Sequence, residues 1–143
     1  MIFKVTTKYA ICAVTYLIDN GMGRVITAKE IADKRGIPSS YLPRILGKMA
    51  KAGIIDSFHG GRDRGYRMVR DPGDISLYEV LDIFEQWSNE GCLLSPGNRD
   101  CTCNVKYCWE AIEEKMFLPL KEITVRDVCE ADTEAAVKEL LTG

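Results

Sequence analysis

The sequence predicts a mainly α-helical fold with a small β-hairpin wing: a winged helix-turn-helix followed by a long C-terminal helix. Two short amphipathic segments joined by a tight turn at Gly36 are typical of a helix-turn-helix. Two apolar runs then flank a loop rich in glycine and arginine, and this pattern predicts a hairpin. A cysteine-rich stretch separates this unit from a helix-like segment that starts at Asn104.

Length and composition agree with one small domain and a helical extension. The chain has 143 residues, 46% hydrophobic and 28% charged, which excludes a disordered or collagen-like protein. A break at Asp71-Pro-Gly-Asp74 separates a winged helix-turn-helix domain, residues 1–72, from a cysteine-containing region, residues 73–143. No uncharged run is long enough for a membrane span and no signal peptide is apparent, so we expect a cytoplasmic protein.

The first helix is expected over residues 5–19. Thr27 and Glu30 predict a capping box, in which each side chain accepts a bond from the backbone N–H of the other residue. This box opens a helix that stops at Gly36, and a second helix runs over residues 41–53. These two helices form the expected helix-turn-helix.

The wing is expected from strands at residues 54–58 and 66–69, joined by a flexible basic tip. Beyond the break, Ser76 and Glu79 predict another capping box at the start of a helix. An irregular stretch, residues 88–103, follows and is called the cysteine segment below. The long helix from Asn104 should end or kink at Pro119, and a short capped helix and a fraying tail complete the chain.

The net charge of −2 hides an asymmetry along the chain. Residues 34–70 carry nine Lys and Arg against two acids, whereas residues 71–143 carry six against sixteen. A basic helix-turn-helix with a basic wing predicts binding to double-stranded DNA. The candidate contacts are Ser39, Ser40, Tyr41, Arg44, Lys48 and Lys51 on the second helix, and His59, Arg62 and Arg64 in the wing.

These candidates suit different parts of DNA. Arg44 suits the edge of a guanine, whereas Lys48 and Lys51 suit backbone phosphates. Arg62 and Arg64 at the tip of the wing suit a minor groove.

Four of the six cysteines lie close together in the sequence, at Cys92, Cys101, Cys103 and Cys108. Their spacing matches neither a zinc ribbon nor a C-x-x-C redox motif. A stretch with glycine and proline lets several thiolates converge, and thiolates select iron–sulfur clusters, zinc or Cu(I). Metal ligation or redox sensing is therefore expected rather than a disulfide framework.

Several short motifs also occur in a specific order. They are Lys8-Tyr-Ala, Ile37-Pro-Ser-Ser-Tyr-Leu42, Lys51-Ala-Gly-Ile-Ile55, Gly65-Tyr66, Cys92 to Cys103, Trp109 and Ile123-Thr-Val. With this order the chain resembles the IscR/NsrR-type winged-helix transcription regulators. The resemblance implies a homodimer joined through the long dimerisation helix, a roughly palindromic operator, and control of DNA affinity by an iron–sulfur cluster, either 2Fe–2S or 4Fe–4S.

The resemblance implies three cysteine ligands in the cysteine segment. Cys92 and Cys103 match the first and last of these, since Trp109 follows Cys103 by six residues, and Cys101 is our choice for the middle one. Cys108 lies five residues beyond Cys103, so on one helix their side chains differ by about 140° around the axis. A ligand role for Cys108 is therefore weighed against a place in the core.

The fourth ligand varies among such proteins and can come from the first helix of the partner subunit. Where some members carry an acidic ligand this chain has Lys8, whose ammonium group offers no lone pair. Cys12 is a candidate for this ligand, although its spacing also fits a core position. Cys129 is expected to be structural, and Lys106 stands where some relatives carry a histidine ligand.

These expectations combine into a homodimeric transcription regulator whose iron–sulfur cluster senses redox state, iron, cluster status or nitric oxide. The alternative is a DNA-binding regulator without a cluster, which uses zinc or a thiol–disulfide switch. A thiol redox or metal-transfer protein is a third possibility. We do not expect an enzyme, because the only histidine lies in the wing and no pair of base and nucleophile is apparent.

Overall fold

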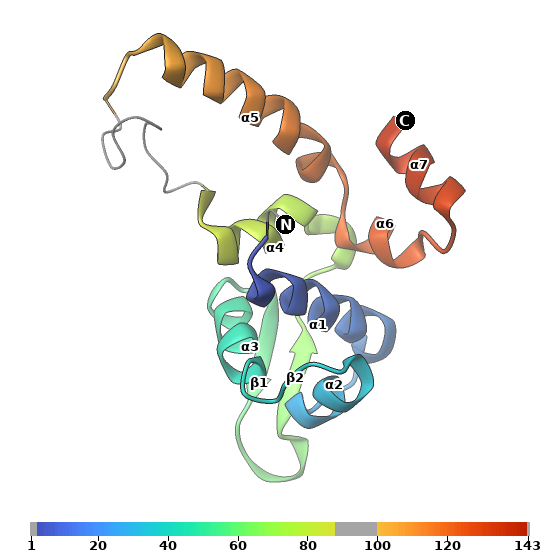
Figure 1. Cartoon of the computed structure of the whole chain (residues 1–143). Coiled ribbons are helices and arrows are strands. Elements are labelled where there is room, and N and C mark those ends of the chain that lie inside the picture. The colour runs from blue at the N-terminus through green and yellow to red at the C-terminus, as the bar shows by residue number, and fades with distance from the viewer. Residues whose placement is uncertain (1–2, 88–99, 143) are drawn as a thin grey trace.

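The computed structural model describes residues 3–87 and 100–142, and its elements follow the predicted order up to residue 130. The tail, which was expected to fray, forms a further helix over Glu134–Thr142. Three helices and a hairpin form a lower unit, above which α4 and the long helix α5 extend (Figure 1). The predicted fold class, mainly helical with a two-stranded antiparallel hairpin, is confirmed. The elements are α1 (Val5–Gly21), α2 (Ala28–Arg35), α3 (Leu42–Lys51), β1 (Ile55–Phe58), β2 (Gly65–Met68), α4 (Leu77–Glu85), α5 (Asn104–Glu122), α6 (Val125–Glu130) and α7 (Glu134–Thr142), with short 3-10 turns at Gly61–Asp63 and Pro72–Asp74.

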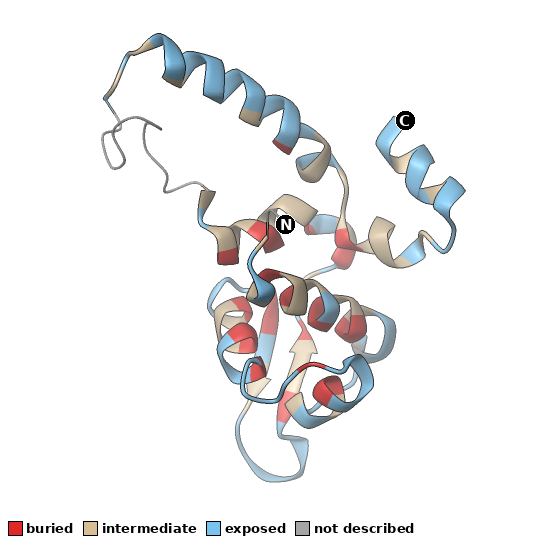
Figure 2. Cartoon of the chain, in the orientation of Figure 1, coloured by how far each residue is buried: buried red, intermediate tan, exposed pale blue. Residues whose placement is uncertain are grey.

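The apolar core lies between α1, α2, α3 and the hairpin, where Figure 2 shows most of the buried residues. The apolar stripe predicted for α3 is confirmed, because its four members are at most 1% exposed. These are Leu42, Ile45, Leu46 and Met49. Burial of this stripe leaves the opposite face of α3, with its polar and basic side chains, in solvent.

The start of α2 shows only half of the predicted capping box. The Thr27 hydroxyl accepts a bond from the Glu30 N–H at 3.1 Å, as expected. The Glu30 carboxylate does not return this bond, because it accepts bonds from the Tyr16 hydroxyl and the Arg24 guanidinium, both at 2.8 Å. Bonds from Arg24 and Tyr16 hold the pKa of Glu30 below its usual range. The charged donor Arg24 makes the stronger bond, and the bond from Tyr16 links α2 to α1.

The start of α4 departs from the prediction in the same way. The Ser76 hydroxyl accepts a bond from the Glu79 N–H, but the Glu79 carboxylate pairs with Arg70. A complete capping box is present at the start of α6, where Thr124 and Asp127 exchange both bonds. Spacing in the sequence therefore predicted the caps, whereas tertiary partners decided where the two glutamates point.

The wing is fastened to the segment that precedes α2. β1 and β2 pair with Ile55 opposite Met68 and Phe58 opposite Gly65. Tyr66 and Ile26 also exchange two backbone bonds, of 2.7 and 2.8 Å. Gly65 makes this approach possible, because a Cβ atom there would lie 2.4 Å from the Ile26 carbonyl oxygen.

Backbone bonds also anchor the corner between α5 and α6 to the segment that leads into α4, whose Ile75 lies in the same core as the helix-turn-helix. The Leu77 N–H donates to the Ile123 carbonyl at 2.8 Å, and the Val125 N–H donates to the Ile75 carbonyl at 2.9 Å. Ile75 and Val125 are buried, and Arg126 forms an ion pair with Asp71. The position of α5 is therefore coupled to the helix-turn-helix at this corner.

The long helix was expected to end or kink at Pro119. It does not end there but continues to Glu122, and its last turn is held by the corner described above. Its apolar stripe of Val105, Trp109, Ile112 and Met116 is 39–50% exposed, and Phe117 is the buried residue of α5. In the part of the chain that the structure describes, no helix has both the length and the apolar character needed to cross a bilayer.

Candidate functional site

The exposed start of α3 is held in place by contacts with α1. Ser39 and Ser40 are exposed in the turn before the helix, and Tyr41 is 39% exposed. The Tyr41 ring packs edge-on against Tyr9 of α1, with centroids 5.2 Å apart. Pro43 falls in the first turn of α3, where no backbone donor is lost. This packing presents the start of α3 to a partner in the manner of a recognition helix.

The predicted basic side chains lie along the outer side of α3. Arg44 and Lys51 are exposed, whereas Lys48 is half-buried with its ammonium group 5.7 Å from the centre of the Phe84 ring. Among the described residues, none of the three forms an ion pair with an acid. Their charges are therefore available to an anionic partner.

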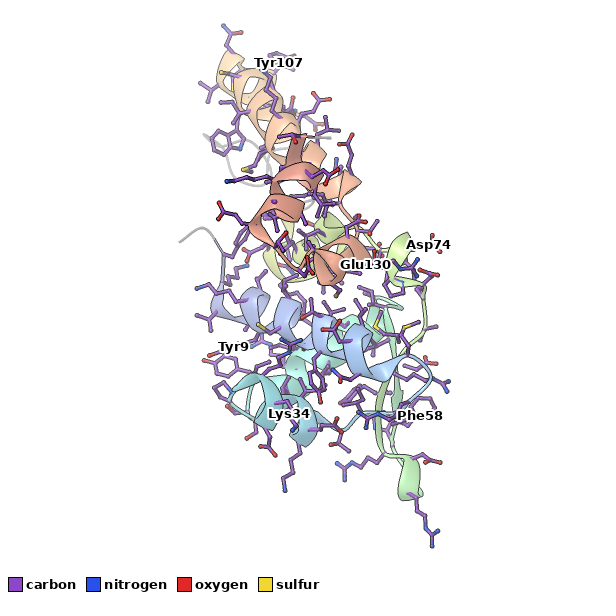
Figure 3. The ribbon with its side chains drawn as sticks, turned by 90° about the vertical axis from the view of Figure 1, so that its right-hand side faces the viewer. Tyr9, Lys34, Phe58, Asp74, Tyr107 and Glu130 are labelled. Carbon is purple, nitrogen blue, oxygen red and sulfur yellow. The ribbon has the colours of Figure 1, made fainter. Side chains whose placement is uncertain are left out.

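The wing adds cations beside α3. Arg62, Arg64 and His59 are exposed near its tip, and the Ser57 hydroxyl lies 2.9 Å from Nε2 of His59. The guanidinium of Arg67 packs over the Phe58 ring at 5.1 Å. Figure 3 shows Phe58 on the hairpin and Lys34 on α2, at the end of the molecule away from Tyr107 of α5. The basic surface is thus far from the start of α5.

A groove of about 300 Å³ lies between the wing, the start of α2 and α3. We call it the wing groove, and its lining includes Lys29, Pro43, His59 and Arg64. Lys29 is not predictable as a contact from the sequence, because nothing in the pattern of α2 separates it from other solvent-facing lysines. The fold places it beside the predicted contacts of the wing.

Two of the predicted cysteine ligands lie together at the start of α5. The sulfur atoms of Cys101 and Cys103 are 3.3 Å apart, and both residues are half-buried. Cys103 is the N-cap of α5, and its sulfur accepts a bond from the Lys106 N–H at 3.4 Å. Two sulfur atoms at this separation can contribute to one metal centre. Cys92 lies outside the described residues.

The core positions expected for two other cysteines are wrong. Cys108 is exposed on α5, and the helix starts directly after Cys103, so the two side chains point in different directions. Cys12 is also exposed, because the buried face of α1 is formed by Ala13, Val14 and Leu17. Within residues 3–87 and 100–142, no three His, Cys, Asp or Glu side chains gather into a metal site.

Cys129 on α6 has different surroundings. It is half-buried, and burial, followed by the nearby Asp19 carboxylate, raises the pKa of its thiol to about 11. The thiol therefore stays protonated near neutral pH. This agrees with the structural role expected for Cys129, since thiolates rather than thiols bind metals.

An aromatic cluster of Phe3, Tyr78, Trp87 and Phe117 lies just beyond the end of α4, beside α5. The ring of Trp87 stacks on Phe117 of α5 at 4.6 Å and lies 5.6 Å from Tyr78. Phe3, near the N-terminus, is 6.1 Å from Trp87. Burial raises the pKa of the Tyr78 hydroxyl. The cluster thus joins the N-terminus, α4 and α5 at one end of the cysteine segment.

Comparisons with known proteins agree with this geometry. Residues 3–131 match the family model Rrf2, described as an iron-dependent transcriptional regulator. A protein of Aquifex aeolicus named as an HTH-type transcriptional regulator is 29% identical over 133 residues, which cover 90% of this chain and 91% of that protein.

Two solved structures show the same fold. IscR of T. potens has a TM-score of 0.72 and 22% identity, and the match covers 94% of this chain and 90% of that one. CymR (YrzC), described as the global cysteine regulator of B. subtilis, has a TM-score of 0.74 and 16% identity, with coverage of 93% and 99%. The resemblance to IscR/NsrR-type regulators is thereby confirmed.

Proposed function

Because this chain belongs to the Rrf2 family, we propose that it is a homodimeric regulator whose operator affinity is set by an iron–sulfur cluster in the cysteine segment. Its general function follows from the family, because members are DNA-binding transcription regulators and not enzymes. The observation that carries the cluster proposal is the pair of sulfurs at the start of α5, 3.3 Å apart with one at a helix N-cap. We place the protein in the cytoplasm, where thiols stay reduced.

The donor set fits an iron–sulfur cluster. Cys92, Cys101 and Cys103 would hold it, and Cys108 or the partner subunit's Cys12 would supply the fourth ligand. Both candidates for the fourth ligand are exposed, so each is accessible to a cluster that is held by the other three cysteines. The cluster would supply a centre that loses or gains electrons, or that reacts with nitric oxide, while the protein positions it.

Aromatic contacts provide a route from this segment to the DNA-binding face. Trp87 immediately precedes the cysteine segment and stacks on Phe117 of α5. Three residues earlier, Phe84 of α4 lies 5.7 Å from the ammonium group of Lys48 on α3. A change in the cysteine segment that moves the end of α4 therefore changes the surroundings of a basic residue on the recognition helix.

On DNA, α3 would enter the major groove and the wing would reach an adjacent minor groove. Ser39, Ser40, Tyr41 and Arg44 are proposed to meet base edges there. The remaining candidates are proposed to bind the backbone or the minor groove, and they are Lys48, Lys51, His59, Arg62 and Arg64.

The exposed apolar stripe of α5 supports the homodimer. Its residues recur every three or four positions over Val105 to Met116, as in helices that pack along a seam. Ile112→Asp is expected to convert the dimer into a monomer, because a carboxylate would be buried at the centre of this seam. Light scattering measures the mass, and binding to a two-half-site duplex should weaken at least tenfold. Lys115→Asp, which adds a carboxylate at an exposed polar position of α5, is the control. A dimeric Ile112→Asp protein would contradict the assignment.

Iron and acid-labile sulfide measured on anaerobically prepared protein test the cluster proposal. We expect two or four irons per cluster with equal sulfide, and a brown protein with thiolate-to-iron absorption. Zinc without sulfide, or a protein free of metal, would overturn it. The alternative with zinc or a thiol–disulfide switch would then hold, because adjacent Cys101 and Cys103 also suit those chemistries.

A further inference from the structure

A second groove borders α3 and was not expected from the sequence. It has a volume of about 350 Å³ and lies between the start of α1, α3 and the end of α4. Its polar lining consists of Lys4 and Thr6 at the start of α1, Arg44 and Lys48 of α3, and Gln86 at the end of α4. We call it the N-terminal groove.

The N-terminal groove and the wing groove use different faces of α3. Pro43 lines the wing groove, whereas Arg44 and Lys48 line the N-terminal groove. On a helix these positions lie about 100° and 140° around the axis from Pro43. The exposed start of α3 therefore has a cation-lined groove on each side.

The charge in the N-terminal groove is positive. The ammonium group of Lys4 donates to the Phe84 carbonyl at 3.1 Å and lies 3.9 Å from Glu85. The side chain of Glu85 is only 8% exposed and does not line the groove, because it accepts bonds from the Lys4 N–H and the Thr7 hydroxyl. Arg44 and Lys48 have no such acidic neighbour among the described residues, so at least two charges are uncompensated.

We propose that the N-terminal groove binds a backbone phosphate of the operator, beside the recognition helix. The major groove of DNA is about 12 Å wide, which matches the diameter of one helix, so a phosphate chain runs along each side of an inserted helix. In this arrangement the wing groove faces the phosphates of one DNA strand, and the N-terminal groove binds a phosphate of the other DNA strand. The ammonium groups of Lys4 and Lys48, the Thr6 hydroxyl and the Gln86 amide can donate hydrogen bonds to phosphate oxygens, which leaves Arg44 for a base edge.

This inference rests on the proposed mode of DNA binding and adds Lys4 and Thr6 to it. It also gives the end of α4 a part in DNA binding, because Gln86 lines the groove and lies two residues before the cysteine segment. The shape of the groove therefore depends on the element that leads into the sensor.

The salt dependence of binding tests the proposal. The probe is a duplex of about 30 base pairs that the full-length protein selects from a random pool, and affinity is measured by fluorescence anisotropy over a range of NaCl. Loss of one phosphate contact lowers the slope of log affinity against log salt by about 0.9, which corresponds to about eightfold weaker binding at 0.1 M. Lys4→Gln and Lys48→Gln should each show this change, with the same ranking of base-substituted duplexes as the unaltered protein.

Lys138→Gln is the matched control, since Lys138 is an exposed lysine paired with Glu134 on α7, away from both grooves. Circular dichroism checks that each variant is folded, and Thr6→Val, which removes only the hydroxyl, should weaken binding without a change of slope. If Lys4→Gln keeps the slope of the unaltered protein while Arg62→Gln in the wing lowers it, the N-terminal groove does not bind phosphate and the winged-helix mode stands. If neither variant changes the slope, the proposed binding mode fails as well.

Discussion

Replacing either Cys92 or Cys103 by alanine is expected to remove the brown colour of the anaerobic protein and to lower its iron and sulfide content more than tenfold. Each change deletes one of the proposed thiolate ligands, and loss of even an outer-shell partner of a metal site costs about tenfold or more. Cys103→Ala also removes the sulfur that caps α5. Operator affinity should then no longer differ between anaerobic and oxidised preparations, as measured by anisotropy.

Cys129→Ala provides the control for this experiment. Its thiol has a pKa raised to about 11 and is half-buried on α6, so the change should leave cluster content and regulation intact. If both the Cys92 and the Cys103 variants keep their colour and their regulated binding, the ligand assignment is wrong. Cys101→Ala, Cys108→Ala and Cys12→Ala then identify the remaining ligands by the same measurement.

Gly65→Ala is expected to lower the free energy of unfolding by about 2–3 kcal/mol and to weaken DNA binding strongly. The backbone at Gly65 has φ +149°, and an added Cβ would lie 2.4 Å from the Ile26 oxygen and 2.9 Å from the Val25 side chain. Relief of this clash requires β2 to move away from Ile26, which breaks the two backbone hydrogen bonds between Tyr66 and Ile26. The wing would then lose its attachment beside α2.

Urea unfolding measures the loss of stability, and anisotropy with the selected duplex measures the loss of affinity. Gly60→Ala is the matched control in the same hairpin, since Gly60 has φ −139° and open space at its Cβ position. A Gly65→Ala protein with unaltered stability would show that the contact between Tyr66 and Ile26 does not hold the wing. A destabilised variant that binds DNA normally would show that the wing makes no essential contact.

Much of the fold was predictable because its signals are local. Thr27 and Ser76 cap their helices as their spacing to Glu30 and Glu79 predicts. The buried stripe of α3 follows from helical periodicity, which acts within one element. The end of α5 was less predictable: local sequence predicts an end or a kink at Pro119, whereas the corner between α5 and α6, formed with residues far away in the chain, holds the turn that continues to Glu122.

The candidate site was predictable only in part. Residues of α3 and the wing were found because a basic segment that forms a helix and a hairpin has a known relation to DNA. Lys4 and Thr6 were missed, since they are some forty residues before Arg44 and only packing of α1 against α3 brings them to the same groove. Likewise, the exposure of Cys12 and Cys108 depends on which faces of α1 and α5 pack against other elements of the same chain.

The order of elements, the helix caps, the basic wing and the clustering of cysteines near α5 therefore follow from residue order, because each depends on neighbours a few positions away. The two grooves beside α3, the attachment of the wing through Gly65 and the exposed stripe on α5 depend on segments far apart in the chain. Their positions result from burial of the shared core, a condition that the whole chain satisfies at once. The helix-turn-helix and the wing could be predicted from local patterns, whereas the arrangement of basic side chains around the recognition helix depends on the tertiary structure.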